Sequence, residues 1–349
     1  MLATRRGHWL AAGCLAAGLA AGCGGGNVRS ALHDDAQRAP AGPAAPTAEQ
    51  VAAASAAAEL GRRYLYGNGV AQDDAQAVVW LRRAADGGNA MGENLLGLCY
   101  FNGRGVARDE SEAAKWFQRA ADRGDAVGQR ELGLAYEFGR GAPRDQARAA
   151  SLFEAAAAQG DLPSIYLLGL KYTSGDGVPK DMDKGVALVR KAADGGYRQA
   201  QTSLGTAYFL GQGIAQDYAQ AMPWLNKAAE QGDADAQALL AYAYIQGKGV
   251  AKDAKAAFGW MKKAADQGSA NYLYELSTYY WSGTGVAKDH VEAFRLLKKS
   301  ADLGYAKAQY QVALCYGSGD GVARDQALAA EWFRKAAEHG GNAAGGSAH

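Results

Sequence analysis

The feature that most constrains the fold of this chain is a repeat of 36 residues. Gly67 recurs at every thirty-sixth position as far as Gly319, which fills this register eight times. A tyrosine three places before it, a glycine two places after it and an aspartate six places after it, beginning with Asp73, keep the same spacing in all eight copies. Residues 53–340 are therefore eight copies of one unit. Self-similarity at this period predicts a solenoid, because a single unit cannot bury its apolar face without stacking on its neighbours.

The repeat accounts for an unusual glycine content. The chain contains 47 Gly among 349 residues, roughly twice the usual share of ~7%. Twenty-four of them occupy three registers that are glycine in every copy, and five more occupy a fourth register, from Gly61 to Gly205. Most of the glycine therefore belongs to a folded repeat rather than to a low-complexity segment. The hydrophobic share of 48% is enough for a large core.

Each copy is predicted to form two helices, A and B. In the second copy, Leu96 and Cys99 belong to an apolar stripe with helical spacing that places helix A near residues 90–101. Gly103 ends this helix, because glycine readily adopts the left-handed backbone of a helix C-terminus. Asp109 then stands at the N-cap of helix B, where a carboxylate accepts the free N–H groups of the first turn. The predicted fold class is all-α, an α/α solenoid of eight helical hairpins.

Three further registers predict how the helices pack. Glycine inside helix A, as at Gly97, costs ~1 kcal/mol relative to alanine, so its recurrence predicts helices that cross too closely for a larger side chain. A tryptophan register, represented by Trp116, is expected to fill the space between hairpins. Seven of the eight copies have a basic residue at the position of Arg119 and an acid three residues later. This spacing predicts an i, i+3 ion pair on a solvated helix face.

The first 22 residues predict export. They contain two arginines, no acidic residue and an apolar stretch at Trp9–Ala21, which is typical of a signal peptide and too short to span a membrane. The run Leu19–Cys23 resembles the lipobox of bacterial lipoproteins, so Cys23 is the predicted lipid attachment. By the same resemblance, the glycine after Cys23 favours an outer-membrane lipoprotein that faces the periplasm. The alternative is an ordinary signal peptide cut near Ala21 or Gly22, with a soluble periplasmic or secreted product.

Two segments outside the repeats are expected to be flexible. Residues 23–52 are the predicted lipidated cysteine and tether, since they are rich in Gly, Ala and Pro and poor in large apolar side chains. Residues 341–349 are the predicted flexible tail. The whole chain carries a formal charge of +1 with both signs interspersed. This balance argues against a nucleic-acid partner, which usually requires a basic face.

Three motifs of the second copy, Leu96–Tyr100 (LGLCY), Gly103–Asp109 (GRGVARD) and Trp116–Ala121 (WFQRAA), resemble the signature of the Sel-1-like repeat family. This family is related to the tetratricopeptide repeat, and the resemblance covers residues 53–340. It implies a right-handed α/α superhelix that acts as an adaptor for assembling protein complexes. Bacterial members are exported, and some are outer-membrane lipoproteins of the cell envelope or of host-interaction systems.

No catalytic, cofactor or metal site is predicted. A cysteine-rich branch of the same family, with disulfide-paired hairpins, is associated with β-lactam binding or hydrolysis. The repeats of this chain contain only Cys99 and Cys315, six units apart, so a disulfide between them is not expected. The histidines, such as His290 and His339, show no metal-ligand spacing. The recurring aspartates are interpreted as helix caps.

Aromatic residues that depart from the repeat are the candidate partner-binding residues. One register of helix A is tyrosine in three copies, and the seventh copy concentrates further aromatics in one helix A. Since helix A lines the concave groove in tetratricopeptide-like folds, these side chains are expected to contact a peptide or glycan, with packing against the neighbouring copy as the alternative. The candidates are Tyr166, Tyr272, Tyr274, Tyr279, Trp281 and Tyr310.

The expected function is that of a non-catalytic scaffold, without a cofactor, that binds partner proteins in the bacterial cell envelope and is held to the membrane by its lipid anchor. The alternative is a host-interaction factor, or a peptidoglycan- or β-lactam-related binding protein with weak hydrolase activity.

Overall fold

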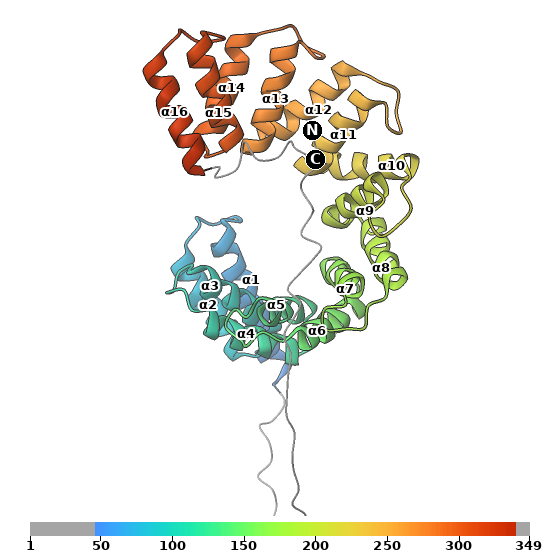
Figure 1. Cartoon of the computed structure of the whole chain (residues 1–349). Coiled ribbons are helices and arrows are strands. Elements are labelled where there is room, and N and C mark those ends of the chain that lie inside the picture. Colours follow the sequence, from blue (N-terminus) through green and yellow to red (C-terminus); the bar gives the residue numbers. More distant parts are fainter. Residues whose placement is uncertain (1–45, 340–349) are drawn as a thin grey trace, which may run out of the picture. The chain divides into compact units, whose positions relative to one another are not determined.

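The computed structural model describes residues 46–339, and all regular secondary structure in that range is helical (Figure 1). Odd-numbered helices are the A helices and even-numbered helices are the B helices. The first eight are α1 (Ala48–Tyr66), α2 (Asp74–Asp86), α3 (Ala90–Asn102), α4 (Glu110–Asp122), α5 (Ala126–Phe138), α6 (Gln146–Ala158), α7 (Leu162–Ser174) and α8 (Met182–Asp194). The others are α9 (Arg198–Leu210), α10 (Tyr218–Glu230), α11 (Ala234–Gln246), α12 (Ala254–Asp266), α13 (Ala270–Ser282), α14 (His290–Asp302), α15 (Ala306–Ser318) and α16 (Gln326–His339). The predicted all-α solenoid of eight hairpins is confirmed.

The signal peptide, the tether up to residue 45, Cys23 and the tail all lie outside the described residues. One boundary differs from the expectation. Helix α1 begins at Ala48, inside the stretch assigned to the tether. Thr47 and Gln50 explain this early start, because each side chain bonds the other residue's backbone N–H in a capping box, at 3.3 and 2.8 Å.

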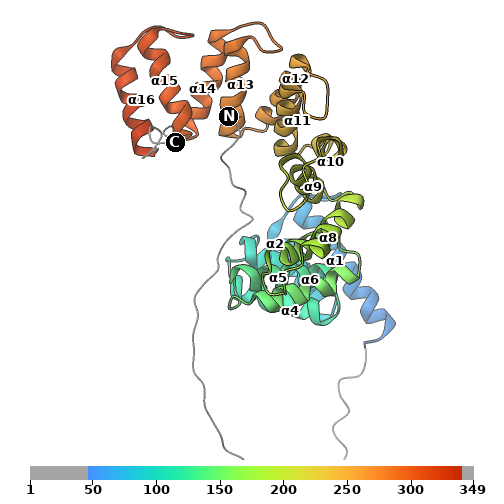
Figure 2. The same ribbon diagram turned by 45° about the vertical axis from the view of Figure 1, so that its right-hand side comes forward.

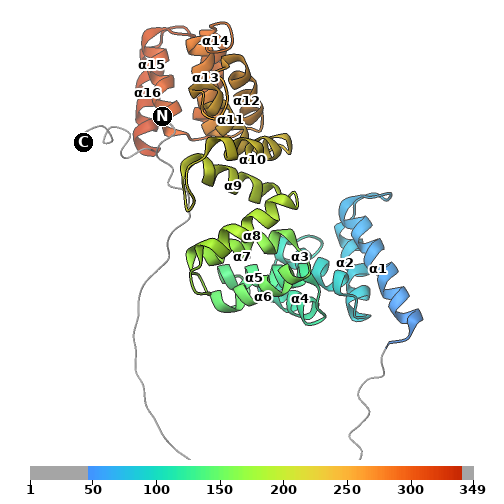
Figure 3. The same ribbon diagram turned by 90° about the vertical axis from the view of Figure 1, so that its right-hand side faces the viewer.

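The described residues form two compact units. Unit 1 contains α1 to α6 and comprises residues 46–164 together with Ser174–Lys180. Unit 2 contains most of α7 and all of α8 to α16, and comprises Ile165–Thr173 together with residues 181–339. Within unit 2, α13 to α16 lie side by side as two neighbouring hairpins (Figure 2). Within unit 1, α3 packs on α4 and α4 on α5 (Figure 3).

Successive A helices also contact each other inside a unit. Helix α1 contacts α3 and α3 contacts α5 in unit 1, and α9 contacts α11 in unit 2. These A helices therefore share one face with the A helices of neighbouring hairpins. No helix in the described range is both long and apolar enough to cross a membrane.

The capping aspartates are confirmed in all eight copies. The carboxylate of Asp109 accepts a hydrogen bond of 2.9 Å from the backbone N–H of Glu112 at the start of α4. The same role belongs to Asp73, Asp145, Asp181, Asp217, Asp253, Asp289 and Asp325. At the other end of the loop, Gly103 has φ +69° and ends α3 in the left-handed conformation, as predicted.

Glycine inside helix A permits a close crossing with helix B of the same hairpin. A Cβ at Gly97 would lie 2.6 Å from the ring of Phe117, and a Cβ at Gly205 would lie 2.8 Å from the side chain of Leu225. Both distances are too short for a real contact. The predicted reason for this glycine register is confirmed.

The second glycine of most loops has a role that the sequence did not indicate. A Cβ at Gly105 would lie 2.1 Å from the carbonyl oxygen of Asp74, which belongs to the preceding hairpin. Gly285 stands in the same relation to Ala254 in unit 2, at 1.9 Å. The loop backbone of one hairpin thus rests directly on the first turn of the previous helix B.

The predicted i, i+3 ion pair is wrong. In five copies the cation instead lies over the tryptophan three residues earlier, as Arg119 does over Trp116 at 4.4 Å and Lys263 over Trp260 at 4.0 Å. The acid bonds a different lysine, since Asp266 pairs with Lys262 at 2.8 Å. The ring face attracts the cation and also covers part of its stem, which an exposed carboxylate does not do.

The loop glycines allow a matched test. We expect Gly105→Ala to lower the melting temperature more than Gly124→Ala does. Both positions have positive φ, +69° and +82°, so both substitutions cost about 1–2 kcal/mol in backbone strain. The new Cβ at position 105 would meet a backbone carbonyl oxygen of the preceding hairpin, whereas a Cβ at position 124 would meet no atom within 4 Å. Thermal unfolding followed by circular dichroism measures the difference, and equal losses would contradict the proposed contact between hairpins.

Candidate protein-binding face

The register that contains three of the candidate tyrosines can be followed through all eight A helices. We call it the A-face register. Most of its members are buried or half-buried, and Tyr310 is the exception, with 46% of its surface exposed. The register consists of Ala58, Asn94, Arg130, Tyr166, Thr202, Ala238, Tyr274 and Tyr310.

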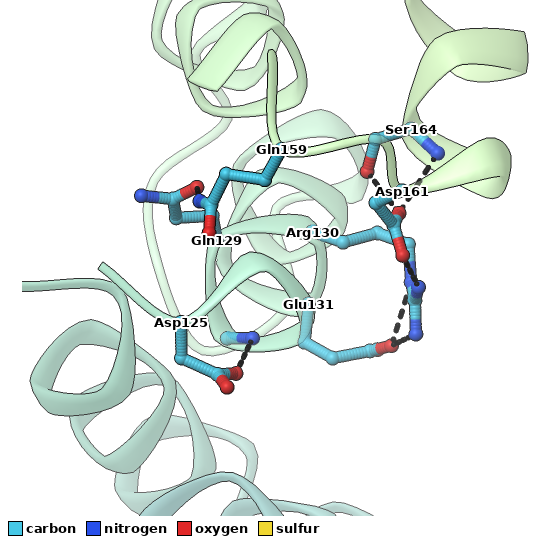
Figure 4. A network of polar contacts seen from close by, with 8 residues as sticks. Asp125, Gln129, Arg130, Glu131, Gln159, Asp161 and Ser164 are labelled. Carbon is cyan, nitrogen blue, oxygen red and sulfur yellow. Dashed lines mark hydrogen bonds and ion pairs between the residues drawn. The ribbon is translucent and has the colours of Figure 1, made fainter. Parts of the chain in front are cut away.

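In unit 1 the A-face register carries a charged network (Figure 4). The guanidinium of Arg130 donates to the carboxylate of Asp161 at 2.7 Å and to that of Glu131 at 3.2 Å. Asp161 also accepts from the backbone N–H and the hydroxyl of Ser164, at 3.0 and 2.6 Å. Beside this network, the amide of Gln159 donates to the side-chain oxygen of Gln129 at 2.9 Å.

The network is largely shielded from solvent. The side chains of Arg130, Glu131 and Asp161 are 19%, 20% and 12% exposed. Burial raises the pKa of the Glu131 carboxyl, and Arg130 opposes that rise. For Arg130 itself burial disfavours the charge, but Asp161 and Glu131 outweigh it and the pKa is raised. The guanidinium is thus the group that keeps two shielded carboxylates together.

In unit 2 the same register carries aromatic pairs. The ring of Tyr166 lies 5.6 Å from that of Tyr197, and the ring of Tyr274 lies 5.3 Å from that of Tyr305. Both pairs join residues 31 apart in the chain, which is also the separation of Arg130 and Asp161. One structural position of the repeat therefore holds an ion pair in unit 1 and ring pairs in unit 2.

Tyr166 and Tyr274 are held in place, whereas Tyr310 is more open. The hydroxyl of Tyr166 lies 2.8 Å from that of Ser203, and burial raises the pKa of both Tyr166 and Tyr274. The ring of Tyr310 packs edge-on against Phe333 at 5.4 Å. Phe333 and Leu314 are themselves 38% and 41% exposed. The end of unit 2 thus presents an apolar, partly aromatic surface.

The other three candidates lie elsewhere on α13. Tyr272 donates its hydroxyl to the carboxylate of Asp235 on α11. Tyr279 is 8% exposed, packs near Phe258 and has its pKa raised to about 12 by burial, so it offers little surface to a partner.

Trp281 lies near the loop that follows α13. It stacks on His290 with ring centroids 4.7 Å apart and planes 4° from parallel. His290 in turn lies 3.6 Å from the carboxylate of Asp320. The six candidates therefore do not form one site: three share the A-face register and three do not.

The sequence reasoning missed the ion pair of Arg130 and Asp161. It also missed Tyr197 and Tyr305, which complete the ring pairs. A signal was available, because Arg130 aligns with Tyr166, and Asp161 with Tyr197, in the repeat. Comparing whole registers, instead of selecting aromatic residues on helix A alone, would have identified Arg130, Tyr197 and Tyr305 as further departures from the repeat.

A second polar register of helix A joins hairpins together and is not a binding feature. The side-chain amides of Gln201 and Gln237 donate to the carbonyl oxygens of Ala193 and Ala229, at the end of the previous helix B, at 3.0 and 2.9 Å. In the second copy this position is Glu93, which is fully buried and paired with two arginines. Buried polar groups that are fully bonded in this way fix the alignment of adjacent hairpins.

The described residues offer little for catalysis by a thiol or a metal. Cys99 and Cys315 are both free and buried, and burial raises the pKa of each thiol to about 11. A thiol of this pKa is protonated near neutral pH and is a poor nucleophile. In the range that the structure describes, no group of three His, Cys, Asp or Glu side chains is placed to hold a metal ion.

The charged network predicts a pH-dependent effect. We expect Arg130→Met to destabilise the protein by about 3 kcal/mol at neutral pH, because it leaves shielded carboxylates without their cation. Without Arg130 the pKa of the Glu131 carboxyl in the folded protein rises further. A carboxyl whose pKa is higher in the folded than in the unfolded state reduces the free energy of unfolding once the pH is high enough to ionise it. The loss should therefore shrink below pH 4.5, the ordinary carboxyl value.

Urea unfolding at several pH values measures this dependence. Arg62→Met, which breaks the exposed pair of Arg62 with Glu59, is the control and should have a much smaller effect at each pH. A loss for Arg130→Met that does not change with pH would show that the guanidinium acts only by packing.

Comparison with known proteins identifies the family of this chain. The Sel1 repeat model matches residues 54–89, 90–125, 126–161, 162–197, 198–233, 234–269, 270–305 and 306–341. A solved Sel1 repeat protein from Oxalobacter formigenes is 33% identical over 84% of this chain and 86% of that chain, with a TM-score of 0.62. The protein c5321, a protective antigen of uropathogenic Escherichia coli with an SLR fold, is 34% identical over 82% of this chain and 69% of its own, with a TM-score of 0.46. No curated protein matches. This chain therefore belongs to the Sel1 repeat family.

Proposed function

We propose that this protein is a non-catalytic adaptor of the bacterial cell envelope that binds a partner protein through the A-face register of unit 2. Sel1 repeat proteins generally mediate protein–protein interactions. The proposal is more specific in two ways: it assigns the partner to one face of the A helices, and it assigns the protein to the envelope.

The main support for this binding face is the contrast between registers that are the same in every copy and the A-face register, which varies. The capping aspartate and the loop glycines are the same in every copy because the fold requires them. The A-face register instead changes from Arg130 to Tyr166 to Thr202 in three consecutive copies. A solenoid position that accepts charged, aromatic and small side chains is less constrained by the fold than the invariant registers, so its accessible members are free to serve recognition.

The physical chemistry of tyrosine supports a protein partner. A tyrosine buries a large apolar area on contact, has few rotatable bonds to immobilise and retains a hydroxyl for hydrogen bonding. Tyr274 and Tyr310 provide this combination in neighbouring hairpins, each with its ring supported by a second ring, Tyr305 or Phe333. Such support holds the side chains in position before a partner binds, which reduces the entropy lost on association.

Two findings support a non-catalytic role. The solenoid family to which the chain belongs is typically non-catalytic. The buried thiols of Cys99 and Cys315 have pKa values of about 11, which opposes a cysteine-dependent hydrolase. The disulfide-paired branch associated with β-lactams also differs from this chain, whose repeat cysteines are both free.

The envelope assignment rests on the sequence alone, because residues 1–45 lie outside the described range. The basic and apolar N-terminus and the lipobox-like run before Cys23 support export followed by lipidation. Acyl chains bury CH₂ groups at ~0.8 kcal/mol each, so two or more chains give stable anchoring.

The binding face can be tested by photo-cross-linking in cells. A photoreactive amino acid at Tyr310, which is 46% exposed on helix A, should capture a partner protein that mass spectrometry identifies. The matched control is Val291, which is 68% exposed on helix B of the same unit and should not capture that partner. Equal capture at both positions would contradict a binding site on the A helices.

The anchor can be tested by changing the predicted lipidated residue. Cys23→Ser should move the protein from the membrane fraction to the soluble fraction after cell breakage, because no acyl chain can be attached. Cys14→Ser is the control, since Cys14 also follows an Ala-Ala-Gly run but has a shorter apolar stretch before it. Unchanged membrane association of Cys23→Ser would rule out this cysteine as the anchor.

A further inference from the structure

The last described helix, α16, has a face that is covered in every other B helix. Phe333 is 38% exposed, whereas its seven equivalents are at most 5% exposed. Ala337, one turn later on the same face, is also exposed, and its seven equivalents are at most 8% exposed. The equivalents of Phe333 are Leu81, Phe117, Phe153, Val189, Leu225, Met261 and Leu297.

Junctions inside unit 2 show what normally covers this face. Leu297 of α14 belongs to one buried cluster with Ala308 and Val312 of the following helix A, α15. Leu225 of α10 is likewise clustered with Ala236 and Leu240 of α11. At these two junctions the cover is a helix A that presents alanine and, four places later, a branched apolar residue; in α13 the first position is Tyr272.

The first described helix, α1, presents such a pair, and no other described helix covers it. In α1 the equivalents of Ala308 and Val312 are Ala56 and Leu60. Ala56 is exposed, although its equivalent Ala308 is fully buried, and Leu60 is half-buried, although the equivalent residues of the other seven copies are at most 4% exposed. Helix α1 follows no described helix B, so this face meets no preceding hairpin.

The segment after α16 is chemically unsuited to cover Phe333. Residues 340–349 consist of Gly, Ala, Asn, Ser and His and include no large apolar side chain. A polar outer face is what usually keeps a terminal repeat soluble. The exposed ring of Phe333 and the exposed face of α1 depart from that rule at opposite ends of the array, and they match each other.

We propose that α16 of one molecule packs against α1 of a second copy, so that the repeat continues from chain to chain. Phe333 of one molecule then contacts Ala56 and Leu60 of the next, as Leu297 contacts Ala308 and Val312 within a chain. The interface is heterologous, because the two surfaces differ, and it therefore generates open chains or closed rings of molecules rather than a symmetric dimer. This self-association does not require the proposed partner-binding function, although the two share Phe333, whose ring also supports Tyr310.

The junction between molecules is weaker than the junctions within a chain. In α15 the amide of Gln309 donates to the carbonyl oxygen of Ala301 on the preceding helix B at 3.2 Å. The equivalent of Gln309 in α1 is Ala57, which has no donor. The end-to-end contact lacks this hydrogen bond, so the association is reversible and depends on concentration.

Sedimentation velocity of the purified full-length chain tests the proposal. The mean mass of the unmodified protein should rise with concentration. Phe333→Lys and Ala56→Lys should each abolish the rise, because each places a charge in the contact from one side. Val291→Lys, at a residue 68% exposed on α14, is the control and should associate like the unmodified protein. Circular dichroism verifies the fold of each variant, and Phe333→Ser replaces the lysine variant if that variant unfolds.

Mixing the two variants distinguishes the geometry. Phe333→Lys retains an intact α1 and Ala56→Lys retains an intact α16, so their mixture should form dimers and nothing larger. A chain that stays monomeric at all concentrations would overturn the proposal. The proposal would also be overturned if Phe333→Lys abolished association and Ala56→Lys left it intact, because that result indicates a symmetric contact between two α16 helices.

Discussion

The close crossing of helix A and helix B within each hairpin is the contact on which the structure depends. At Gly97 and Gly133 a Cβ atom would lie 2.6 Å from the phenylalanine ring opposite. Glycine inside a helix costs ~1 kcal/mol relative to alanine, and the burial of a whole large side chain against the bare backbone offsets that cost. With the hairpin fixed in this way, positions outside the contact are free to vary.

Local features of the fold were predictable because each one is decided within a few residues. Asp109 caps α4 and Gly103 ends α3 through bonds and torsions that involve only their near neighbours. The contact of Gly105 with Asp74 was not predictable, because it joins the backbones of two hairpins. The predicted ion pair of Arg119 failed for a related reason: spacing shows which side chains lie near each other on one helix, but not that Arg119 pairs with the buried Glu93 of α3 and lies over the ring of Trp116.

The candidate site was predicted only in part. The alignment of the copies identified Tyr166, Tyr274 and Tyr310 as departures from the repeat, and all three lie in the A-face register. It did not identify their partners 31 residues later, because a register alignment shows where copies differ without showing which registers touch. Once the pairing is known, Arg130 with Asp161 and Tyr166 with Tyr197 are alternative occupants of one position. The two units thus present different chemistry from one backbone.

The invariant registers build the solenoid, whereas we propose that Tyr274 and Tyr310 of the variable A-face register recognise a partner. The most direct test replaces both Tyr274 and Tyr310 by threonine, the residue that the fifth copy has in this register at Thr202. Proteins recovered from the cell envelope with this variant are compared by quantitative mass spectrometry with those recovered by the unmodified chain. The account predicts an intact cooperative unfolding transition together with loss of the partner. Full recovery of the partner, or collapse of the fold, would contradict it.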